Sequence, residues 1–359
     1  LMDRSMYGFE YSRLNNDYIT YNELINCFNW DILGYSSEER PILSAELGTG
    51  DQSICIWAGM HGNETTGLHI ILELIELFHK KQLELEGFTV HIIPIINPDA
   101  YIRNTRRNGM GIDMNRDFRS FQTVESAKLI GWIKMIDPVL CFNLHDQRTI
   151  FHVLTHSAYT SLLVPSSDTE RTLTPIRRRL MNQVGNAIAA MNIPLKGIGR
   201  YTDEFYPTAV GDYLMSQKIP NVLIESGVSS GDMQRTRARK FGVGFIRAML
   251  SSNQVQCDLY DLLPLNEQGQ LEWVFTDVLY AHMRVDIAVK RVVAMNGHQK
   301  AEIYVVDDLG DLSSRPRLYE IPGSSMGISD VLTVDRPVTG VFGTVVFEQG
   351  QLVIGNLPE

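Results

Sequence analysis

The chain has 359 residues, a formal net charge of −10, and 44% hydrophobic and 21% charged residues. This is the composition of an ordinary globular protein, and the length favours one large domain plus a smaller one. The negative charge argues against nucleic acid as a partner, because phosphate binding requires clustered Lys and Arg. The one basic run, residues 171–180, is typical of the solvated face of a helix.

Cysteine usage and hydropathy exclude further classes. The cysteines form no Cys-x-x-Cys pair, so neither a thiolate zinc site nor a disulfide framework is predicted. No run of about 18 apolar residues predicts a membrane helix, and the N-terminal segment has no apolar signal core. We therefore expect no membrane partner and a cytoplasmic location, while the sequence gives no indication of the oligomeric state.

The hydrophobic pattern predicts alternating helices and strands over the first 250 residues. In chain order, the expected elements are a helix over 11–30, a strand over 53–60, a helix over 64–82, a strand over 88–100, a helix over 123–136, a strand over 139–145, a helix over 171–191, a strand over 221–226 and a helix over 232–250.

Strands that are apolar on both faces and separated by helices indicate an α/β fold. We expect a mixed, mostly parallel sheet with helices on both faces. Beyond about residue 256 the helical periodicity gives way to alternating, β-branched runs with turns between them. The predicted domains are therefore 1–255, an α/β domain, and 256–359, a smaller β-rich domain.

Polar residues follow the ends of the predicted strands. His61 and Glu64 follow the strand over 53–60, His145 ends the strand over 139–145, and Glu225 lies near the end of the strand over 221–226. In an open α/β sheet, ligands bind outside the carboxyl ends of the strands. The pattern thus predicts that two His and two Glu side chains meet at one edge of the sheet.

Two His and one Glu with an open position for water form a known catalytic zinc set. His61 and Glu64, three residues apart on a tight turn, can reach one ion, and His145 supplies a third ligand. Taken alone, the first two also fit a turn His and a Glu favoured by a helix dipole. Glu225 would then act as the base for the metal-bound water and as the acid for the leaving amine. The alternative is a strand-end Glu that pairs with an Arg.

A loop rich in Arg and Asn, residues 101–118, is the third informative segment. One Arg near a metal could polarise a scissile carbonyl and stabilise the oxyanion. Another could hold a substrate carboxylate through two parallel hydrogen bonds. The alternative is a solvated basic loop.

Taken in order, these segments resemble the zinc carboxypeptidase family of the carboxypeptidase A type, over roughly residues 20–250. The matching motifs are "GYSSEERPI", "HGNE", "NPDAY", "GIDMNRDF", "FNLH", "YPTAVGD" and "IPNVLIESG". The resemblance implies one Zn²⁺ ion bound by His61, Glu64 and His145. It also implies that Glu225 is the general base and acid.

The resemblance extends to substrate binding. Asn115 and Arg116 match the pair that grips the terminal carboxylate of the substrate, and Tyr206 matches a mobile substrate-binding tyrosine, with Tyr201 as its rival. Arg106 best matches the arginine that polarises the carbonyl. Because loop length varies here, the other candidates for that role are Arg103 and Arg107.

Two features depart from the digestive carboxypeptidases. Asp146 follows the ligand His where those enzymes have Ser, and "HGNET" with the C-terminal β domain also resembles the succinylglutamate desuccinylase and aspartoacylase relatives. Two features favour a peptidase over an acylase. About sixty residues precede His61, whereas the acylases begin close to their His, and Tyr206 has no evident function in an acylase. Gly211, near the family's specificity position, offers no charge, so a basic preference is not indicated.

The sequence therefore predicts a zinc metallocarboxypeptidase that cleaves the amide bond next to a free C-terminal carboxylate, with a peptide or acyl-amino-acid substrate. The alternatives are an N-acyl amino acid deacylase and a murein-peptide amidase. A carboxylate-binding module on an inactive scaffold is the non-enzyme alternative, but every matching position holds a residue competent for the chemistry.

Overall fold

The computed structural model describes residues 18–251, 255–296, 299–323, 327–328 and 331–358. It divides into two compact units. Unit 1 comprises the described residues of Leu1–Gln147, Thr160–Ser226 and Gln234–Leu265; unit 2 comprises those of Arg148–Tyr159, Gly227–Met233 and Asn266–Glu359. Two short segments of the predicted first domain, 148–159 and 227–233, therefore group with the C-terminal strands.

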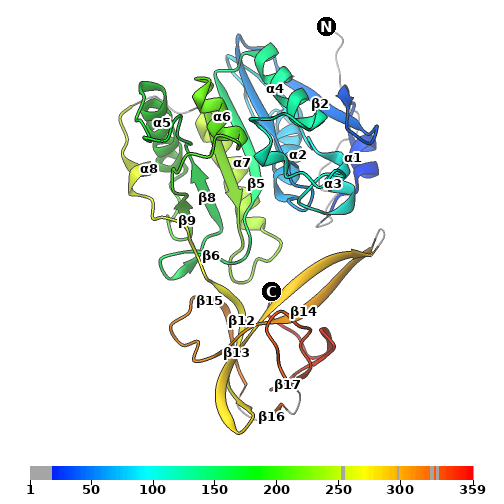
Figure 1. Cartoon of the computed structure of the whole chain (residues 1–359). Helices are drawn as coiled ribbons and strands as arrows, with labels where there is room; N and C mark the ends of the chain where they lie inside the picture. The colour runs from blue at the N-terminus through cyan, green and yellow to red at the C-terminus, as the bar shows by residue number, and fades with distance from the viewer. Residues whose placement is uncertain (1–17, 252–254, 297–298, 324–326, 329–330, 359) are drawn as a thin grey trace. The chain divides into compact units, whose positions relative to one another are not determined.

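An eight-stranded sheet forms the centre of unit 1 (Figure 1). Its spatial order is β1-β2-β4-β3-β5-β10-β8-β9. The four strands β4, β3, β5 and β10 run parallel to one another, and β8 pairs in parallel with β9. The pairs β1–β2, β2–β4 and β10–β8 are antiparallel, so the predicted mixed sheet is confirmed. The strands are β1 (Asp31–Tyr35), β2 (Pro41–Gly48), β3 (Gln52–Trp57), β4 (Phe88–Ile93), β5 (Leu140–Asp146), β8 (Thr160–Leu163), β9 (Ile198–Arg200) and β10 (Asn221–Ser226).

Helices cover both faces of this sheet, as predicted. On one face α2 packs against α7, and α7 packs against α5. On the other, residues of α4 and α6 form one core cluster with inward-facing residues of β3 and β5. The helices are α1 (Tyr21–Cys27), α2 (Thr66–His79), α3 (Pro98–Arg103), the 3₁₀ helix η2 (Met114–Arg116), α4 (Val124–Ile136), α5 (Pro175–Met191), α6 (Val210–Ser216), α7 (Thr236–Ser251) and α8 (Leu259–Leu262).

The first helix is shorter than the sequence pattern predicts. The expected helix spans 11–30, but α1 covers only Tyr21–Cys27. Thr20 begins it with a reciprocal capping box: its side chain accepts from the Glu23 backbone, and the Glu23 carboxylate accepts from the Thr20 backbone. Residues 11–17 of the expected helix lie outside the described residues.

Unit 2 is rich in β-structure, as predicted. Its core cluster centres on aromatic and aliphatic side chains that include Trp273, Phe275 and Phe347. The hairpin of β6 and β7 pairs with β11, which explains why residues 148–159 belong to this unit. The strands are β6 (Phe151–Val153), β7 (His156–Ser157), β11 (Glu267–Gln268), β12 (Leu271–Tyr280), β13 (Met283–Asn296), β14 (Gln299–Gly310), β15 (Arg317–Pro322), β16 (Gly327–Ile328), β17 (Gly340–Phe342), β18 (Val345–Glu348) and β19 (Gln351–Ile354).

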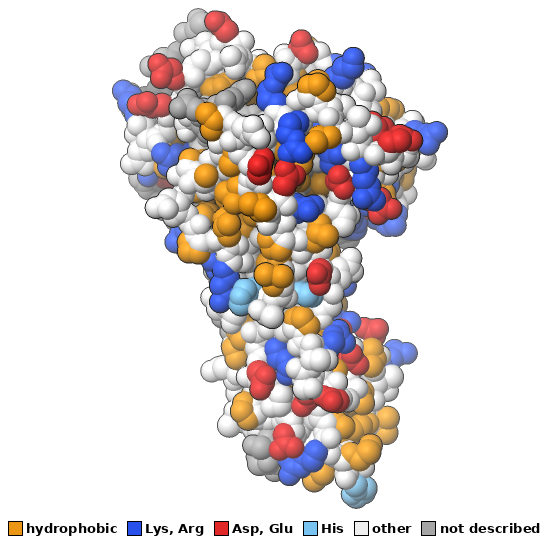
Figure 2. All heavy atoms as spheres, turned by 90° about the vertical axis from the view of Figure 1, so that its left-hand side faces the viewer, with side chains coloured by type: hydrophobic (Ala, Val, Ile, Leu, Met, Phe, Trp, Pro, Cys, Tyr) orange, Lys and Arg blue, Asp and Glu red, His pale blue; other side chains and the backbone are white. Residues whose placement is uncertain are grey.

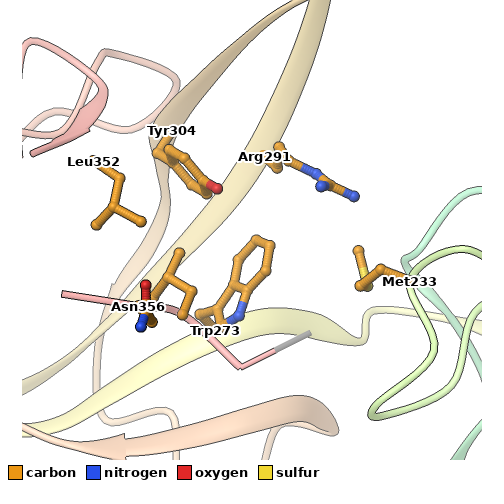
Figure 3. Close-up of a pocket in the computed structure, with 7 residues that line it drawn as sticks. Met233, Trp273, Arg291, Tyr304, Leu352 and Asn356 are labelled. Atoms are coloured by element: carbon orange, nitrogen blue, oxygen red, sulfur yellow. The ribbon is translucent and has the colours of Figure 1, made fainter.

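Unit 2 also contains a hollow of about 380 Å³ (Figure 3). Trp273 lines it and donates its indole N–H to the Pro358 carbonyl. Arg291 reaches it from β13, with Nη1 3.2 Å from an oxygen of Glu302. None of the predicted site residues lines it; the lining residues are Met233, Trp273, Arg291, Tyr304, Leu352, Asn356 and Leu357. No helix among the described residues is both long and apolar enough to cross a bilayer.

A buried carboxylate anchors α3, the helix that starts the Arg-rich loop. Asp99 is fully buried in the first turn of α3, which Asn97 caps. One Asp99 oxygen accepts from Ser36 Oγ and Arg40 Nη1, both at 2.7 Å, and the other accepts from Ser37 Oγ at 3.1 Å. These bonds tie the segment between β1 and β2 to the base of the loop, so the loop starts from a fixed point.

Asp99→Ala is expected to lower the free energy of unfolding by about 3 kcal/mol, because the hydroxyl groups and the Arg40 guanidinium lose a buried acceptor. Urea denaturation measures this loss. Asp51→Ala, which removes an exposed carboxylate from the β2–β3 turn, is the control and should change stability by less than about 0.5 kcal/mol. Equal stability of the two variants would contradict an anchoring role.

Candidate active site

The turn after β3 places His61 and Glu64 close together. The Gly62 N–H donates to the Thr105 carbonyl at 2.8 Å, and the Glu64 N–H donates to the His61 carbonyl at 3.2 Å. A Cβ at Gly62 would lie 2.0 Å from the backbone of Ala100, so only glycine allows this close approach. Glu64 lies on the turn just before α2, not within its first helical turn as the sequence suggests.

His145 and Glu225 come from neighbouring parallel strands. His145 lies near the end of β5, and Glu225 is its register partner on β10. Residues paired in register point to the same face of a sheet, so the two side chains are neighbours. The structure thus brings together at one edge the two His and two Glu residues that follow from the strand-end pattern.

Glu64 bridges the two histidines. Its Oε1 is 2.7 Å from His61 Nδ1, and its Oε2 is 2.6 Å from His145 Nδ1. One ligand atom from each of the three residues lies within 4.8 Å of the others. Both histidine side chains are 2% exposed and the glutamate is 10% exposed. Two imidazole nitrogens and a carboxylate oxygen in this arrangement fit a divalent ion such as Zn²⁺.

A carboxylate behind His61 completes its orientation. Asp113 Oδ1 lies 3.0 Å from His61 Nε2, which leaves Nδ1 facing Glu64. Histidines that bind metals commonly donate their second ring N–H to a carboxylate in this way. Asp113 lies two residues before Asn115 in the motif "GIDMNRDF", but no local pattern in the sequence predicts its contact with His61. By contrast, His145 Nε2 is buried with no hydrogen-bond partner among the described residues.

The charges at the site shift the pKa values of its members. Burial raises the pKa of Glu64, but the charges of His145 and His61 outweigh it and hold that pKa well below its ordinary value. Burial lowers the pKa of His61, yet Glu64 and Asp113 raise it to about 9. Burial, followed by the charge of Glu64, raises the pKa of Glu225 to about 8. Glu64 and His61 thus stabilise each other's charged forms, while Glu225 tends to keep its proton.

The structure separates the three candidate arginines. Arg106 Nη1 lies 3.4 Å from Glu64 Oε1, and its Nε donates to Asp113 at 2.9 Å. Arg103 instead pairs with Glu38 at 2.7 Å, and Arg107 donates to a backbone carbonyl at 3.0 Å. Among the three, Arg106 alone contacts the His–Glu–His group, and at 46% side-chain exposure it remains accessible to a ligand.

Asn115 and Arg116 follow Asp113 closely in the chain, and Arg116 contacts Tyr206. Asn115 Oδ1 accepts from the Val210 N–H at 3.0 Å, which ties the 3₁₀ helix η2 to the start of α6. The Arg116 guanidinium lies 5.8 Å from the centre of the Tyr206 ring, a cation–π contact. Tyr206 is 48% exposed and its hydroxyl donates to Glu204 at 3.0 Å, while the hydroxyl of its rival Tyr201 donates to Gln147 at 3.1 Å.

Asp146, where the digestive enzymes have Ser, has a structural role here. Its Oδ2 accepts from the Thr65 N–H at 3.1 Å and from Thr66 Oγ1 at 2.8 Å, and pairs with Arg235 Nη1 at 2.7 Å. Burial raises the pKa of Asp146, and the charge of Arg235 opposes that shift. The pair joins the start of α2, the end of β5 and the start of α7, and no pattern in the sequence predicts the part that Arg235 takes in it.

The basic run over 171–180 does not form a cationic patch. Arg177, predicted as part of a solvated face, is only 3% exposed and pairs with Asp203 at 2.5 Å. Arg178 pairs with Asp261 at 2.6 Å. On the face that carries α5, Lys and Arg side chains are interspersed with Asp and Glu (Figure 2). The arginines of this run are therefore used to hold α5 to its neighbours.

Comparison with known proteins identifies the family. A profile described as zinc carboxypeptidase, peptidase M14, matches residues 20–209. This chain therefore belongs to the zinc carboxypeptidase family, and the predicted resemblance is confirmed. The matched range holds the His–Glu–His group and the Arg-rich loop but ends before Glu225.

The curated relatives are carboxypeptidases, and each aligns with this chain over only part of its own length. Mouse carboxypeptidase D is 29% identical over 154 residues, which cover 34% of this chain and 11% of that protein. Mouse carboxypeptidase M is 32% identical over 111 residues, which cover 24% of this chain and 25% of that protein. The chain thus spans about a tenth of carboxypeptidase D and a quarter of carboxypeptidase M.

Solved structures share the fold. A metallo-carboxypeptidase from Burkholderia cenocepacia aligns with a TM-score of 0.51 at 17% identity, covering 62% of this chain and 63% of that one. Carboxypeptidase A from Helicoverpa armigera also has a TM-score of 0.51 at 17% identity, covering 69% and 76%. At this identity, the likeness shows the carboxypeptidase fold alone.

Asp113→Asn is expected to weaken metal binding by about 10- to 100-fold, because His61 loses the carboxylate that orients it and increases its basicity. Competition with a chromophoric chelator measures the affinity. Glu46→Gln is a matched control, since Glu46 contacts the ring of His91 at 3.1 Å away from the His–Glu–His group. Equal affinities in the two variants would contradict the proposed function of Asp113.

Asp212 offers a pH test of the same region. It is 4% exposed in the first turn of α6, and its Oδ1 accepts from the Tyr206 N–H at 3.1 Å. Burial raises the pKa of the Asp212 carboxyl from its ordinary value to about 6. The folded state therefore binds this proton more tightly than the unfolded state, so the group's stabilising contribution is present below pH 4 and is lost as the pH rises through 6.

Asp212→Asn should remove this pH dependence while keeping the acceptor for Tyr206. Relative to wild type, the metal-free variant should gain up to about 3 kcal/mol of unfolding free energy between pH 4 and pH 7. Denaturant titrations of both proteins at the two pH values measure the difference in unfolding free energy between them. The other titrating groups are the same in both proteins, so their contributions cancel. A difference that does not change with pH would show that the folded-state pKa of Asp212 is ordinary.

Proposed function

We propose that this protein is a zinc-dependent metallocarboxypeptidase. In this proposal His61, Glu64 and His145 hold one Zn²⁺ ion, and the substrate is a peptide with a free C-terminal carboxylate. The observation that carries the proposal is the buried His–Glu–His group with Glu225 as the register partner of His145. Bound Zn²⁺ supplies Lewis acidity: it lowers the pKa of a water molecule and polarises a carbonyl.

Glu225 is the proposed acid–base residue. Its carboxylate has no hydrogen-bond partner among the described residues, and burial raises its pKa to about 8. A cation held by the neighbouring residues lowers that pKa toward neutrality, where one carboxyl group can both accept and return a proton. Glu225 takes the proton of the attacking water and delivers it to the leaving amine.

Two sets of cationic and polar groups position the substrate. Arg106, beside Glu64 and Asp113, is placed to donate hydrogen bonds to the carbonyl oxygen as negative charge develops on it. Arg116, resting on the Tyr206 ring, can bind a carboxylate through two parallel hydrogen bonds, and Asn115 adds an amide. Because these groups recognise a carboxylate, cleavage is restricted to the last residue of the peptide.

The decisive experiment compares N-blocked dipeptides with a free or an amidated C-terminus, alongside N-acetyl and N-succinyl amino acids, using the zinc-loaded protein. The free-acid dipeptides should be cleaved at least about 100-fold faster than the amidated ones, because the amides forfeit charge-assisted hydrogen bonds to Arg116. Cleavage of the acyl amino acids alone would replace the peptidase with a deacylase. Cleavage of none would overturn the proposal.

Glu225→Gln is the internal control for this chemistry. It should retain stoichiometric zinc and lose about 10²- to 10⁴-fold in kcat, because an amide cannot accept the proton of the water. The exposed Glu46→Gln is the matched substitution and should keep full activity. Normal activity in Glu225→Gln would contradict its assigned role.

A further inference from the structure

The sheet beside Glu225 is open to solvent where a central strand is normally covered. Leu223 lies two residues before Glu225 on β10, and side chains two apart point to the same face. Leu163 of β8 is its register partner. Both leucines are only half-buried, although β10 and β8 lie inside the eight-stranded sheet. The helical layer on this face therefore leaves the row of Leu223 and Leu163 accessible.

Buried polar side chains without partners surround this row. Ser161 is the register partner of Glu225, and Asn143 is the register partner of Leu223. Asn221 lies two residues before Leu223 on β10, again on the same face. Their exposed fractions are 0%, 2% and 0%. The hydroxyl of Ser161, the oxygen of Asn143 and both amide atoms of Asn221 have no hydrogen-bond partner among the described residues.

An unpartnered polar atom in a protein interior costs about 1–3 kcal/mol. Several such groups on one face of three adjacent strands, beside an accessible row, therefore point to a ligand that hydrogen-bonds there. Gly211 allows Asn221 to take this position, since a Cβ on Gly211 would lie 2.8 Å from Asn221 Nδ2.

These residues lie where the side chain of a substrate's C-terminal residue would bind. Val210, next to Gly211, is hydrogen-bonded to Asn115 of the carboxylate-binding pair. Asn221 thus packs beside the helix start that binds Asn115, and Asn143 and Ser161 lie on the same sheet face toward Glu225. When the substrate carboxylate is held at Arg116 and its amide at Glu225, the side chain of the same residue extends over Leu223 and Leu163.

We propose that Asn143, Ser161 and Asn221 form a polar floor that selects substrates whose C-terminal residue carries an uncharged, hydrogen-bonding side chain, an amide or a hydroxyl. The inference rests on the proposed carboxypeptidase function and names its substrate class. Leu163 and Leu223 contact the aliphatic stem of that side chain. Uncharged groups are selected because neutral dipoles do not compensate the desolvation of a full charge.

The test uses free-acid dipeptides that differ only in an isosteric terminal residue, Asn against Leu and Thr against Val. The ratio of kcat/KM values for Asn over Leu should be about 10- to 100-fold, because the apolar isostere leaves the floor unpaired. Ser161→Ala and Asn143→Leu should each lower one or both ratios by about 5-fold or more. An equal rate for both members of each pair would overturn the inference.

Thr160→Val is the matched control. Thr160 is 1% exposed and its hydroxyl is likewise unpartnered, but its register partner is Ser226, so it points to the opposite face from Ser161. Its loss should leave both substrate ratios unchanged. If Thr160→Val lowers the ratios as much as Ser161→Ala does, a general loosening of β8 explains the effect and the inference is wrong.

Calorimetric binding to zinc-loaded Glu225→Gln separates this inference from the proposed function. Cleavage without any preference for Asn or Thr overturns the polar floor and leaves the carboxypeptidase standing. Binding that prefers Asn over Leu, and loses the preference with Ser161→Ala, supports the floor even if no dipeptide is cleaved by the wild type. Neither binding nor cleavage would overturn both.

Discussion

The carboxylate of Glu64 is the interaction on which the site depends. It lies between the imidazoles of His61 and His145, which belong to a turn after β3 and to neighbouring β5. Burial strengthens this contact, because charges interact more strongly away from water. Asp113 fixes the far side of His61 and Arg106 contacts the same Glu64 oxygen, so each of these groups is placed by reference to one carboxylate.

Strand register controls what surrounds that carboxylate. In the parallel pair of β5 and β10, Glu225 faces His145, and the antiparallel pair of β10 and β8 adds Ser161 to the same row. A slip of one residue would turn all of these side chains to the opposite face. The proposed acid–base role of Glu225 and the proposed substrate preference therefore rely on the same backbone hydrogen bonds, which buried central strands keep in place.

Ion pairs distant in sequence divide the arginines between structure and chemistry. Glu38, 65 residues from Arg103, binds that side chain at the base of the loop, while Arg106 extends to the His–Glu–His group. Arg235, 89 residues from Asp146, pairs with the acid that follows His145. Glu64, Asp113 and Asp146 can therefore stay buried as carboxylates, because each lies beside a cation or a histidine ring.

The sequence by itself determined the four parallel strands at the centre of the sheet, the main helices between them and the meeting of His61, Glu64, His145 and Glu225, because apolar strand runs and the polar residues at their ends are local patterns. It missed the flanking strands β1, β2, β8 and β9 and the short helices α3 and α6. It overextended the first helix, which begins at the capping box of Thr20. Only the tertiary structure decided which arginine reaches the site, that Asp146 pairs with Arg235, and that the β6–β7 hairpin joins β11 of unit 2. These outcomes depend on partners far apart in the chain, which no local pattern specifies.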